Sequence, residues 1–228
     1  MPLEDFPKPA VTIDSIVFGY DGVGLSVLLL NRREAPFANM WTLPGGFLQI
    51  HETFEACAAR ILVTKTGLRG LYLEQLYTFG GIERDPRDRV LSVAYYALVN
   101  PLRYKLIAGQ AANEVRWFKL NALPTLGFDH KDMIQTAYAR LRGKVRYNPI
   151  GFELLDQRFT FQELHQLYEI ILAKEINRGN FWKKIRETGL LRHTGERRVG
   201  GKHRAPELFE FDRDKYAALS EHGFEFLV

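Results

Sequence analysis

The sequence predicts a two-domain α/β (α+β) protein, in which a domain with a mixed sheet is followed by a small domain of helices and a basic hairpin. Three observations lead to this prediction. Strand-like and helix-like runs alternate through the first part of the chain, the break RYNPIG follows at 146–151, and positive charge gathers beyond that break. Breaks that contain Pro and Gly are typical of domain boundaries. We therefore place the two domains at 1–147 and 148–228.

The composition is that of a globular protein with a core of its own. Of the 228 residues 46% are hydrophobic and 25% are charged, which excludes a disordered or fibrous chain. The lone Cys57 excludes an internal disulfide and indicates a reducing compartment. No apolar run reaches the roughly 18 residues of a membrane span. The start, MPLEDFPKP, is unlike a secretory signal, so we expect a cytoplasmic protein.

Positive charge is concentrated in one segment of the second domain. Residues 178–204 contain nine Lys or Arg and two Glu, a net charge of +7, whereas the whole chain carries +4, which leaves −3 (4 − 7) for the rest. A basic cluster confined in this way indicates a negatively charged partner, nucleic acid above all. The alternative is a basic face that only contacts solvent.

The first domain shows the signals of a sheet. Apolar, strand-like runs at 10–33 surround a GYDGVG turn and predict a hairpin, and MWTLPGGFLQ predicts a strand that ends in a Pro-Gly-Gly break. Further strands are expected at about 71–79, 90–99 and 114–119.

Two helices accompany these strands. Residues 53–66 predict a helix that Gly67 ends. Its buried face is expected to consist of Phe54, Cys57, Ala58, Ile61 and Leu62. The segment FDHKDMIQTAYARLR predicts another helix, which Asp129 can cap. Its apolar face contains Ile134, Ala137 and Leu141.

The second domain has the pattern of a winged helix-turn-helix. TFQELHQLYEIILAKE predicts a helix opened by a capping box of Thr160 and Glu163, with Leu164, Leu167, Ile171 and Leu172 on its core face. After a short break, NFWKKIRETGLL predicts a second helix with Phe181, Ile185 and Leu190 inward. The tail RHTGERRVGGKHRAPELFEF reads as a basic hairpin. In a winged helix the second helix enters the major groove of DNA.

Between these signals lies the stretch GFLQIHETFEACAARILVTKTGL at 46–68. It resembles the signature of the Nudix hydrolases, G-x5-E-x7-R-E-U-x-E-E-x-G-U with U aliphatic, and WTLPGG before it matches that family too. The resemblance implies an α/β/α sandwich for the first domain. Three acidic positions are lost, however, because Ile61, Thr64 and Lys65 stand in their places.

The altered box argues against hydrolysis. Diphosphate hydrolysis in this family needs divalent metal, and Mg²⁺ prefers carboxylate ligands. One carboxylate, Glu52, does not hold a metal cluster, and Lys65 repels a cation. We therefore expect no catalytic residue, no metal and no cofactor, and a box that shapes a binding pocket. Lys65 can instead meet a ligand phosphate as a fixed substitute for Mg²⁺.

Several polar residues suggest that this pocket binds a ligand. The turn RDPRDR at 84–89 brings three arginines near a strand, and arginines suit phosphate recognition. The segment FDH opens a helix whose N-terminal amides favour anions. The alternatives are a solvated turn for RDPRDR and an ordinary first-turn helix residue for His130. The candidate ligand-binding residues are Arg32, Arg33, Glu52, Lys65, Arg84, Arg87, Arg89, Phe128 and His130.

The second helix of the winged helix carries the candidate DNA contacts. Arg178 and Asn180 open it, and such side chains pair with guanine and adenine. Lys183, Lys184 and Arg186 follow and suit phosphates, which position the protein on DNA. The full set of candidates is Thr160, Arg178, Asn180, Lys183, Lys184, Arg186, Arg197, Arg198, Lys202, His203 and Arg204.

Together, the altered box, the TFG-x4-DPR-x-R-x-LSVAYYAL run, LGFDHKDMI, TFQELHQLYEIIL and NFWKKI resemble the NrtR family of Nudix-related transcriptional regulators. The resemblance covers nearly the whole chain. It implies a homodimeric bacterial repressor of NAD-metabolism genes that binds a palindromic double-stranded operator and senses ADP-ribose or a related nucleotide. Some relatives sense sugars such as arabinose instead.

Two other functions stay open at this point. The first alternative is a Nudix pyrophosphatase with altered metal ligands. The second is an RNA-binding or scaffold protein that uses its basic tail. Duplex DNA is favoured over RNA, since the strands show no exposed aromatic platform on which bases stack.

Overall fold

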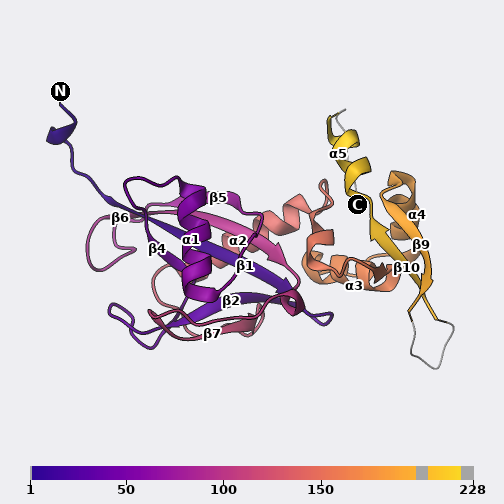
Figure 1. Ribbon diagram of the computed structural model, residues 1–228, viewed down its shortest axis with the longest axis horizontal. Coiled ribbons are helices and arrows are strands. Elements are labelled where there is room, and N and C mark those ends of the chain that lie inside the picture. The colour runs from indigo at the N-terminus through magenta and orange to yellow at the C-terminus, as the bar shows by residue number, and fades with distance from the viewer. Residues whose placement is uncertain (1, 199–204, 222–228) are drawn as a thin grey trace. The chain divides into compact units, whose positions relative to one another are not determined.

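The structure is a computed structural model that describes residues 2–198 and 205–221 (Figure 1). The chain forms two compact units, Met1–Gly19 with Ser26–Tyr138, and Tyr20–Leu25 with Ala139–Val228. The division falls inside helix α2 (His130–Lys144), N-terminal to the boundary predicted between residues 147 and 148. Each unit has its own sheet and its own buried core.

The first unit is built on a seven-stranded mixed sheet. Its main path is β3-β2-β1-β6-β5, with β4 paired to β1 and β7 paired to β2. β1 and β6 pair in parallel, whereas β1–β4, β2–β3, β2–β7 and β5–β6 are antiparallel. The strands are β1 (Ala10–Tyr20), β2 (Leu25–Arg32), β3 (Trp41–Thr42), β4 (Gly45–Phe47), β5 (Glu74–Phe79), β6 (Val90–Val99) and β7 (Ala112–Lys119). The expected mixed sheet is confirmed.

The strand expected to end in a Pro-Gly-Gly break does end before Pro44, but the two glycines were wrongly assigned to the break. The structure has two short strands there, β3 and β4, and both glycines lie in β4. Pro44 separates the strands, since proline has no amide hydrogen for a ladder. Gly45 lies opposite Asp14 of β1, and a Cβ at this position would come within 1.7 Å of the Asp14 Oδ1. Only glycine fits beside that carboxylate.

Helix α1 (Phe54–Thr66) has a cap at each end. The Thr53 side chain accepts a hydrogen bond from the amide of Ala56, as the N-cap does in stable helices. Gly67 ends the helix with a φ of 79° and donates its amide to the Val63 carbonyl. The predicted helix end at Gly67 is confirmed.

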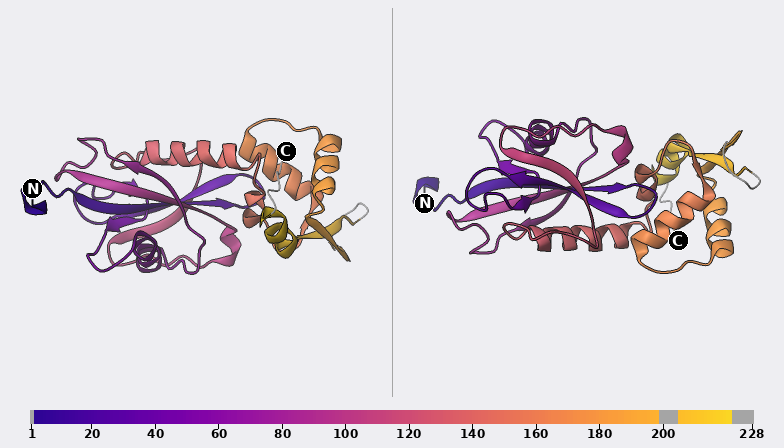
Figure 2. Two further views of the ribbon diagram at one scale, coloured as in Figure 1. Left: turned by 90° about the horizontal axis from the view of Figure 1, so that it is seen from above. Right: turned by 90° about the horizontal axis from the view of Figure 1, so that it is seen from below.

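The buried face of α1 packs on the sheet. Cys57, Ala58 and Ile61 form one cluster with residues of β1 and β6, and Leu62 belongs to a second cluster. Phe54 was expected on this face, but it is 37% exposed, because α1 reaches the buried cluster only one turn later, at Cys57. Figure 2 shows α1 and α2 on opposite faces of the sheet, the arrangement of an α/β/α sandwich.

The second unit is a winged helix. α3 (Phe161–Leu172) and α4 (Arg178–Thr188) pack on a three-stranded sheet of β8 (Phe159–Thr160), β9 (Leu191–Arg197) and β10 (Glu207–Phe211) in the order β8-β10-β9. The capping box of Thr160 and Glu163 is confirmed. The expected core residues of α3 and α4 are buried, and the Phe181 ring lies 5.0 Å from that of Tyr168.

The sequence did not predict every element. α5 (Arg213–Glu221) follows β10, and short 3-10 helices lie at Leu3–Asp5, Pro101–Arg103 and Ile150–Leu154. These segments are short, so their periodicity is weak; two of them also contact each other. The Arg213 guanidinium, for example, lies 2.7 Å from the Glu153 carboxylate. None of the described helices is long and apolar enough to cross a membrane.

Two glycine substitutions are expected to change stability in opposite directions. Gly67→Ala should destabilise the protein by about 1 kcal/mol or more, because alanine is strained at positive φ and its Cβ would lie 3.1 Å from that of Ile107. Gly143→Ala, in the last turn of α2 where an added Cβ meets no described atom within 4 Å, should stabilise by roughly 0.5–1 kcal/mol. Urea unfolding of each variant beside the wild type measures both. A gain in stability for Gly67→Ala would contradict the αL cap.

Candidate ligand pocket and nucleic-acid interface

A cavity of about 210 Å³ lies in the first unit. Its wall comes from β1, β2, β4, the last turns of α1, the loop between β5 and β6, and the start of α2. The lining residues are Thr12, Asp14, Leu30, Arg32, Glu34, Thr42, Leu43, Gly45, Gly46, Phe47, Lys65, Arg84, Asp85, Arg87, Ala111, Phe128 and His130. Four of them are cations and three are carboxylates, so the lining keeps a net positive charge, which suits an anionic ligand.

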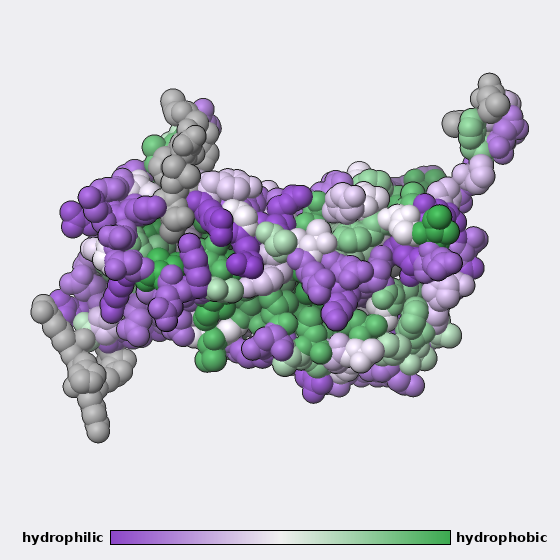
Figure 3. Space-filling view, turned by 180° about the vertical axis from the view of Figure 1, so that it is seen from behind, coloured by the Kyte–Doolittle hydropathy of each residue, from purple (hydrophilic) through white to green (hydrophobic). Residues whose placement is uncertain are grey.

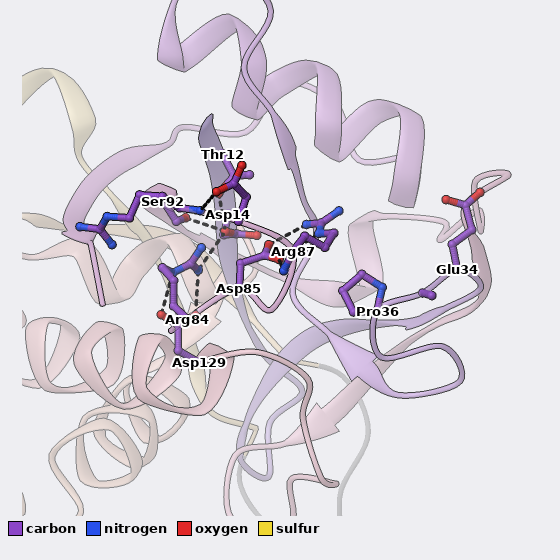
Figure 4. A network of polar contacts seen from close by, with 12 residues as sticks. Thr12, Asp14, Glu34, Pro36, Arg84, Asp85, Arg87, Ser92 and Asp129 are labelled. Carbon is purple, nitrogen blue, oxygen red and sulfur yellow. Dashed lines mark hydrogen bonds and ion pairs between the residues drawn. The ribbon is translucent and has the colours of Figure 1, made fainter. Parts of the chain in front are cut away.

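A buried carboxylate, Asp14, lies in the wall of this cavity (Figure 4). Its Oδ2 accepts a 2.5 Å hydrogen bond from the Ser92 hydroxyl, and the Thr12 hydroxyl lies 3.5 Å away. The Arg84 guanidinium lies 3.8 Å from the same oxygen. A buried carboxylate needs such partners, because its desolvation is otherwise costly.

Arg84 links β1 to the start of α2. It donates two hydrogen bonds to the Asp129 carboxylate, at 2.9 and 2.7 Å, and its side chain is 4% exposed. Figure 4 shows Arg84 between Asp14 and Asp129. Asp129, predicted to cap α2, therefore has its carboxylate engaged by Arg84. A buried, bidentate guanidinium is held rigidly, so the pocket wall is fixed before any ligand arrives.

His130 adds a neutral group beside Asp14. The Leu43 amide donates to His130 Nδ1 at 2.9 Å, which places the ring hydrogen on Nε2, 3.7 Å from Asp14 Oδ1. Burial lowers the pKa of His130, with opposing contributions from the neighbouring carboxylates. The imidazole is thus neutral at pH 7, and it holds the β3–β4 connection against α2.

Arg87 forms a platform with aromatic rings. It donates to Asp85 at 2.9 and 2.6 Å, and these hydrogen bonds lower the pKa of the Asp85 carboxyl. Its guanidinium lies 5.2 Å from the centre of the Phe47 ring and 6.0 Å from that of Phe128. Phe128 adopts a φ of 56° and contacts Phe37, with ring centres 4.6 Å apart. Such a surface suits a planar or sugar ring beside a phosphate.

Six of the predicted ligand-binding residues line the cavity: Arg32, Lys65, Arg84, Arg87, Phe128 and His130. Three others lie elsewhere. Arg33 donates to Asn113, Arg89 donates to the Gly80 and Gly81 carbonyls, and Glu52 pairs with Arg60. The six lining residues come from four segments that the sequence singled out. Arg33, Glu52 and Arg89 lie outside the cavity wall.

The Glu52–Arg60 pair shows what remains of the box. Glu52 accepts two hydrogen bonds from Arg60, at 2.9 and 2.5 Å, and one from the Gln49 amide. The Arg60 hydrogen bonds lower the pKa of Glu52 to about 2. The two side chains of the Nudix frame thus hold the loop before α1, and Arg60 also donates to the Phe47 carbonyl.

These residues do not fit a divalent metal. Ile61 is buried in the core, and the Thr64 hydroxyl donates back to the Arg60 carbonyl. Lys65 places an ammonium in the cavity wall where the signature has a carboxylate. In residues 2–198 and 205–221 no three His, Cys, Asp or Glu side chains are grouped to hold a metal ion. A metal-assisted step has no ligand set here to support it.

Sequence reasoning missed the acidic side of the cavity. Asp14, Glu34 and Asp85 line it, together with Thr12 and Phe47. One signal was present: Thr12 and Asp14 are polar residues two positions apart in an apolar strand, so they share one face. A buried carboxylate in such a strand usually has a functional or structural partner.

The second unit presents its basic residues on α4. Asn177 caps this helix, because its side chain accepts a hydrogen bond from the Asn180 amide. Phe181 and Ile185 are buried. Arg178, Asn180, Lys183, Lys184 and Arg186 are exposed. Among the described residues, the two lysines have no carboxylate within 4.0 Å. Figure 3 shows that much of the visible surface of this unit is hydrophilic. An exposed helix with unpaired cations is the expected form of a DNA-reading helix.

In the β9–β10 hairpin, unlike on α4, the described arginines lie beside carboxylates. Arg197 lies 3.3 Å from Glu207, and Arg198 lies 3.0 Å from Glu163. Thr160 is buried, and its hydroxyl accepts the Glu163 amide. Lys202, His203 and Arg204 fall outside the described residues. A groove between α4 and the hairpin includes Phe161, Arg178, Trp182, Arg197 and Phe209.

Known proteins match both units. The NUDIX domain matches residues 8–137, and the NrtR DNA-binding winged helix domain matches residues 151–211. The ADPR responsive transcriptional repressor NtrR of Acinetobacter baylyi is 36% identical in an alignment of 226 residues that covers 97% of this chain and 87% of that protein. The chain belongs to the NrtR family. The family resemblance read from the sequence is confirmed.

Solved structures of Shewanella oneidensis NrtR resemble this NrtR-family chain. The structure of that protein complexed with a 27mer DNA has a TM-score of 0.81 and 32% identity, and the match covers 95% of this chain and 97% of that one. The structure of its NUDIX domain complexed with ADP ribose has a TM-score of 0.55 and 34% identity, covering 62% and 94%. Both units of the NrtR-family chain therefore have counterparts of the same fold.

The Glu52–Arg60 pair is expected to make stability depend on acid pH. The pKa of Glu52 is lowered from 4.5 to about 2, so its contribution is complete above pH 4.5 and is lost as the pH falls towards 2. The difference in unfolding free energy between the wild type and Glu52→Gln should shrink over this range. Urea unfolding at several pH values measures it. Glu83→Gln, which removes an exposed carboxylate of the same unit, is the control. A constant difference would contradict the assignment.

Proposed function

We propose that this protein is a transcriptional repressor that binds palindromic operator DNA as a homodimer and responds to ADP-ribose or a related nucleotide. One observation carries the proposal: a winged helix with exposed cations on α4 is joined in one chain to a Nudix unit whose cavity is lined by Arg32, Lys65, Arg84 and Arg87. The Acinetobacter relative is named an ADPR responsive transcriptional repressor. A protein of this kind works in the bacterial cytoplasm, where the DNA lies.

The winged-helix unit supports DNA as the partner. The N-terminal residues of α4, Arg178 and Asn180, are exposed and carry the groups that pair with guanine and adenine. Lys183 and Lys184 lie about a turn further along and suit phosphates. The related Shewanella structure was solved with duplex DNA, which favours the same class of ligand here.

The Nudix unit supports a nucleotide diphosphate as the effector. The cavity combines cations, which suit phosphate oxygens, with Phe47 and Phe128, which suit a sugar or base. The Shewanella NUDIX domain was solved with ADP ribose. ADP-ribose is what remains of NAD when nicotinamide is removed, so a repressor that binds it is suited to regulate genes of NAD metabolism.

A homodimer is part of the proposal because operators of this class are palindromes. Two copies place their α4 helices on half-sites one or two helical turns apart. The first unit exposes large apolar side chains that a second copy can cover, among them Ile50, Tyr77 and Ile82. The effector then changes DNA binding because it binds the DNA-bound and the free arrangement of the dimer with different affinities.

Hydrolysis of the nucleotide is the second candidate function, since the first unit is a NUDIX domain. We expect ADP-ribose to bind without turnover, because Ile61, Thr64 and Lys65 replace the acids that hold metal. Calorimetry with the full chain should show ADP-ribose binding, and product analysis with Mg²⁺ or Mn²⁺ should show no metal-dependent hydrolysis. Turnover on the order of 1 s⁻¹ or faster would establish the enzyme instead. Binding of a pentose but not of ADP-ribose would favour a sugar sensor.

Substitutions on α4 are expected to separate phosphate contacts from base contacts. Lys183→Ala should weaken binding to all duplexes alike and lower the salt slope by about one, because one phosphate contact is lost. Arg178→Ala should cost roughly 1–3 kcal/mol and relax specificity at one position. Gel shifts on upstream DNA at several salt concentrations measure both.

The matched control is Lys174→Ala, which removes an exposed lysine just after α3 and should leave DNA affinity unchanged. Footprinting shows whether the protected site is a palindrome. Unchanged affinity for both α4 variants, or an asymmetric site bound by one chain, would refute the assignment of α4 or the dimer. Tighter binding to RNA than to duplex DNA would favour the RNA-binding alternative.

A further inference from the structure

The cavity holds a fixed ammonium group at a position where the Nudix signature has a metal ligand. Lys65 lies in the last turn of α1 and lines the cavity. Its Nζ donates a hydrogen bond to the Gly45 carbonyl. An ammonium has three hydrogens, so two remain for other acceptors. The side chain is half-buried, and this burial lowers the pKa of Lys65.

The ammonium lies beside β4. A Cβ on Gly46 would lie 4.0 Å from Lys65 Nζ, an ordinary contact distance, and 3.3 Å from the Ile61 side chain. Because the ammonium is tied to a backbone carbonyl of β4, its position is set before a ligand binds.

Arg32 is held in the same cavity by backbone carbonyls. Its guanidinium donates to the carbonyls of Glu34 at 2.9 Å, Pro36 at 2.7 Å and Ala35 at 3.4 Å. None of these acceptors carries a formal charge. The loop thus orients the guanidinium of Arg32 through its carbonyls, and the Glu34 carboxylate of the same loop interacts with it only from beyond 4.0 Å.

The other two cations of the cavity are already paired. Arg84 forms its bidentate pair with Asp129, and Arg87 forms one with Asp85. Among the described residues, Lys65 and Arg32 are the lining cations with no carboxylate within 4.0 Å. Glu34 lies apart from the Asp14–Arg84 network in Figure 4. The unpaired positive charge of the cavity therefore lies at Lys65 and Arg32.

We propose that Lys65 replaces the divalent cation of the Nudix site, and that its ammonium, with Arg32, binds the diphosphate of the effector without metal. The proposal rests on the proposed nucleotide response of this protein. A fixed cation supplies the charge that Mg²⁺ would supply to phosphate oxygens, but it brings no activated water. The same residue therefore accounts for retained binding and for absent chemistry. The ligand class is a nucleoside diphosphate or its sugar ester.

Calorimetry on the full chain tests this with ADP-ribose in EDTA and in Mg²⁺. Wild-type affinity should be the same in both buffers. Lys65→Met should weaken binding about ten- to a hundredfold, the effect of losing a hydrogen bond to a charged group. The salt dependence of its affinity should also be shallower than that of the wild type, since one ionic contact is gone. A loss of packing alone would not change that dependence.

Lys105→Met is the matched control, because it removes an exposed lysine of the same unit. It should bind like the wild type. Thermal unfolding without ligand shows whether Lys65→Met is folded. If it is not, Lys65→Gln takes its place, and the comparison of wild type in EDTA and Mg²⁺ needs no variant.

Three results would overturn the proposal. If the wild type binds ADP-ribose only with Mg²⁺, the metal is required and the proposed effector still stands. If Lys65→Met binds as tightly as Lys105→Met, Lys65 is not a ligand contact. If the wild type binds no ADP-ribose in either buffer, the proposed nucleotide response fails and this inference fails with it.

Discussion

The buried carboxylate of Asp14 is the constraint on which the pocket depends. It lies in a central strand, and it is held by the Ser92 hydroxyl with Arg84 and His130 nearby. Arg84 in turn holds Asp129, and His130 holds the Leu43 amide. A carboxylate can be buried only with such partners. One charge therefore ties β1, the β3–β4 connection and the first turn of α2 into a single wall.

The box residues that persist are those that shape this wall. Gly67 ends α1 in a left-handed conformation, and Arg60 joins Glu52 and the Phe47 carbonyl, which fixes the loop before the helix. None of these contacts needs a metal. The residues that would bind one have changed into a core side chain, a hydroxyl engaged by its own helix, and an ammonium. The side chains that keep the frame and the positions where the signature has acids are different residues of one helix, so structure and chemistry can vary separately.

The two units use positive charge differently. In the pocket, Arg84 and Arg87 form bidentate pairs with Asp129 and Asp85. These two arginines therefore stiffen the pocket wall as well as attract an anionic ligand. On α4, Lys183 and Lys184 stay exposed, where they can exchange counterions for DNA phosphates. The hairpin is intermediate, because Arg197 and Arg198 each lie beside a glutamate. Net charge alone does not separate these roles.

Periodicity and short motifs in the sequence determined most of the fold. The Gly67 end of α1, the Thr160–Glu163 capping box and the buried faces of α3 and α4 depend on neighbours in the chain, so local patterns predict them. Six pocket residues were also predicted, because arginines and a lysine in a phosphate-binding frame are conspicuous. Only the tertiary structure showed that Arg33, Glu52 and Arg89 lie outside the cavity and that Asp14 lies within it. Whether a charged side chain is paired depends on residues distant in sequence, such as Arg84 and Asp129. A local sequence pattern does not predict such a contact.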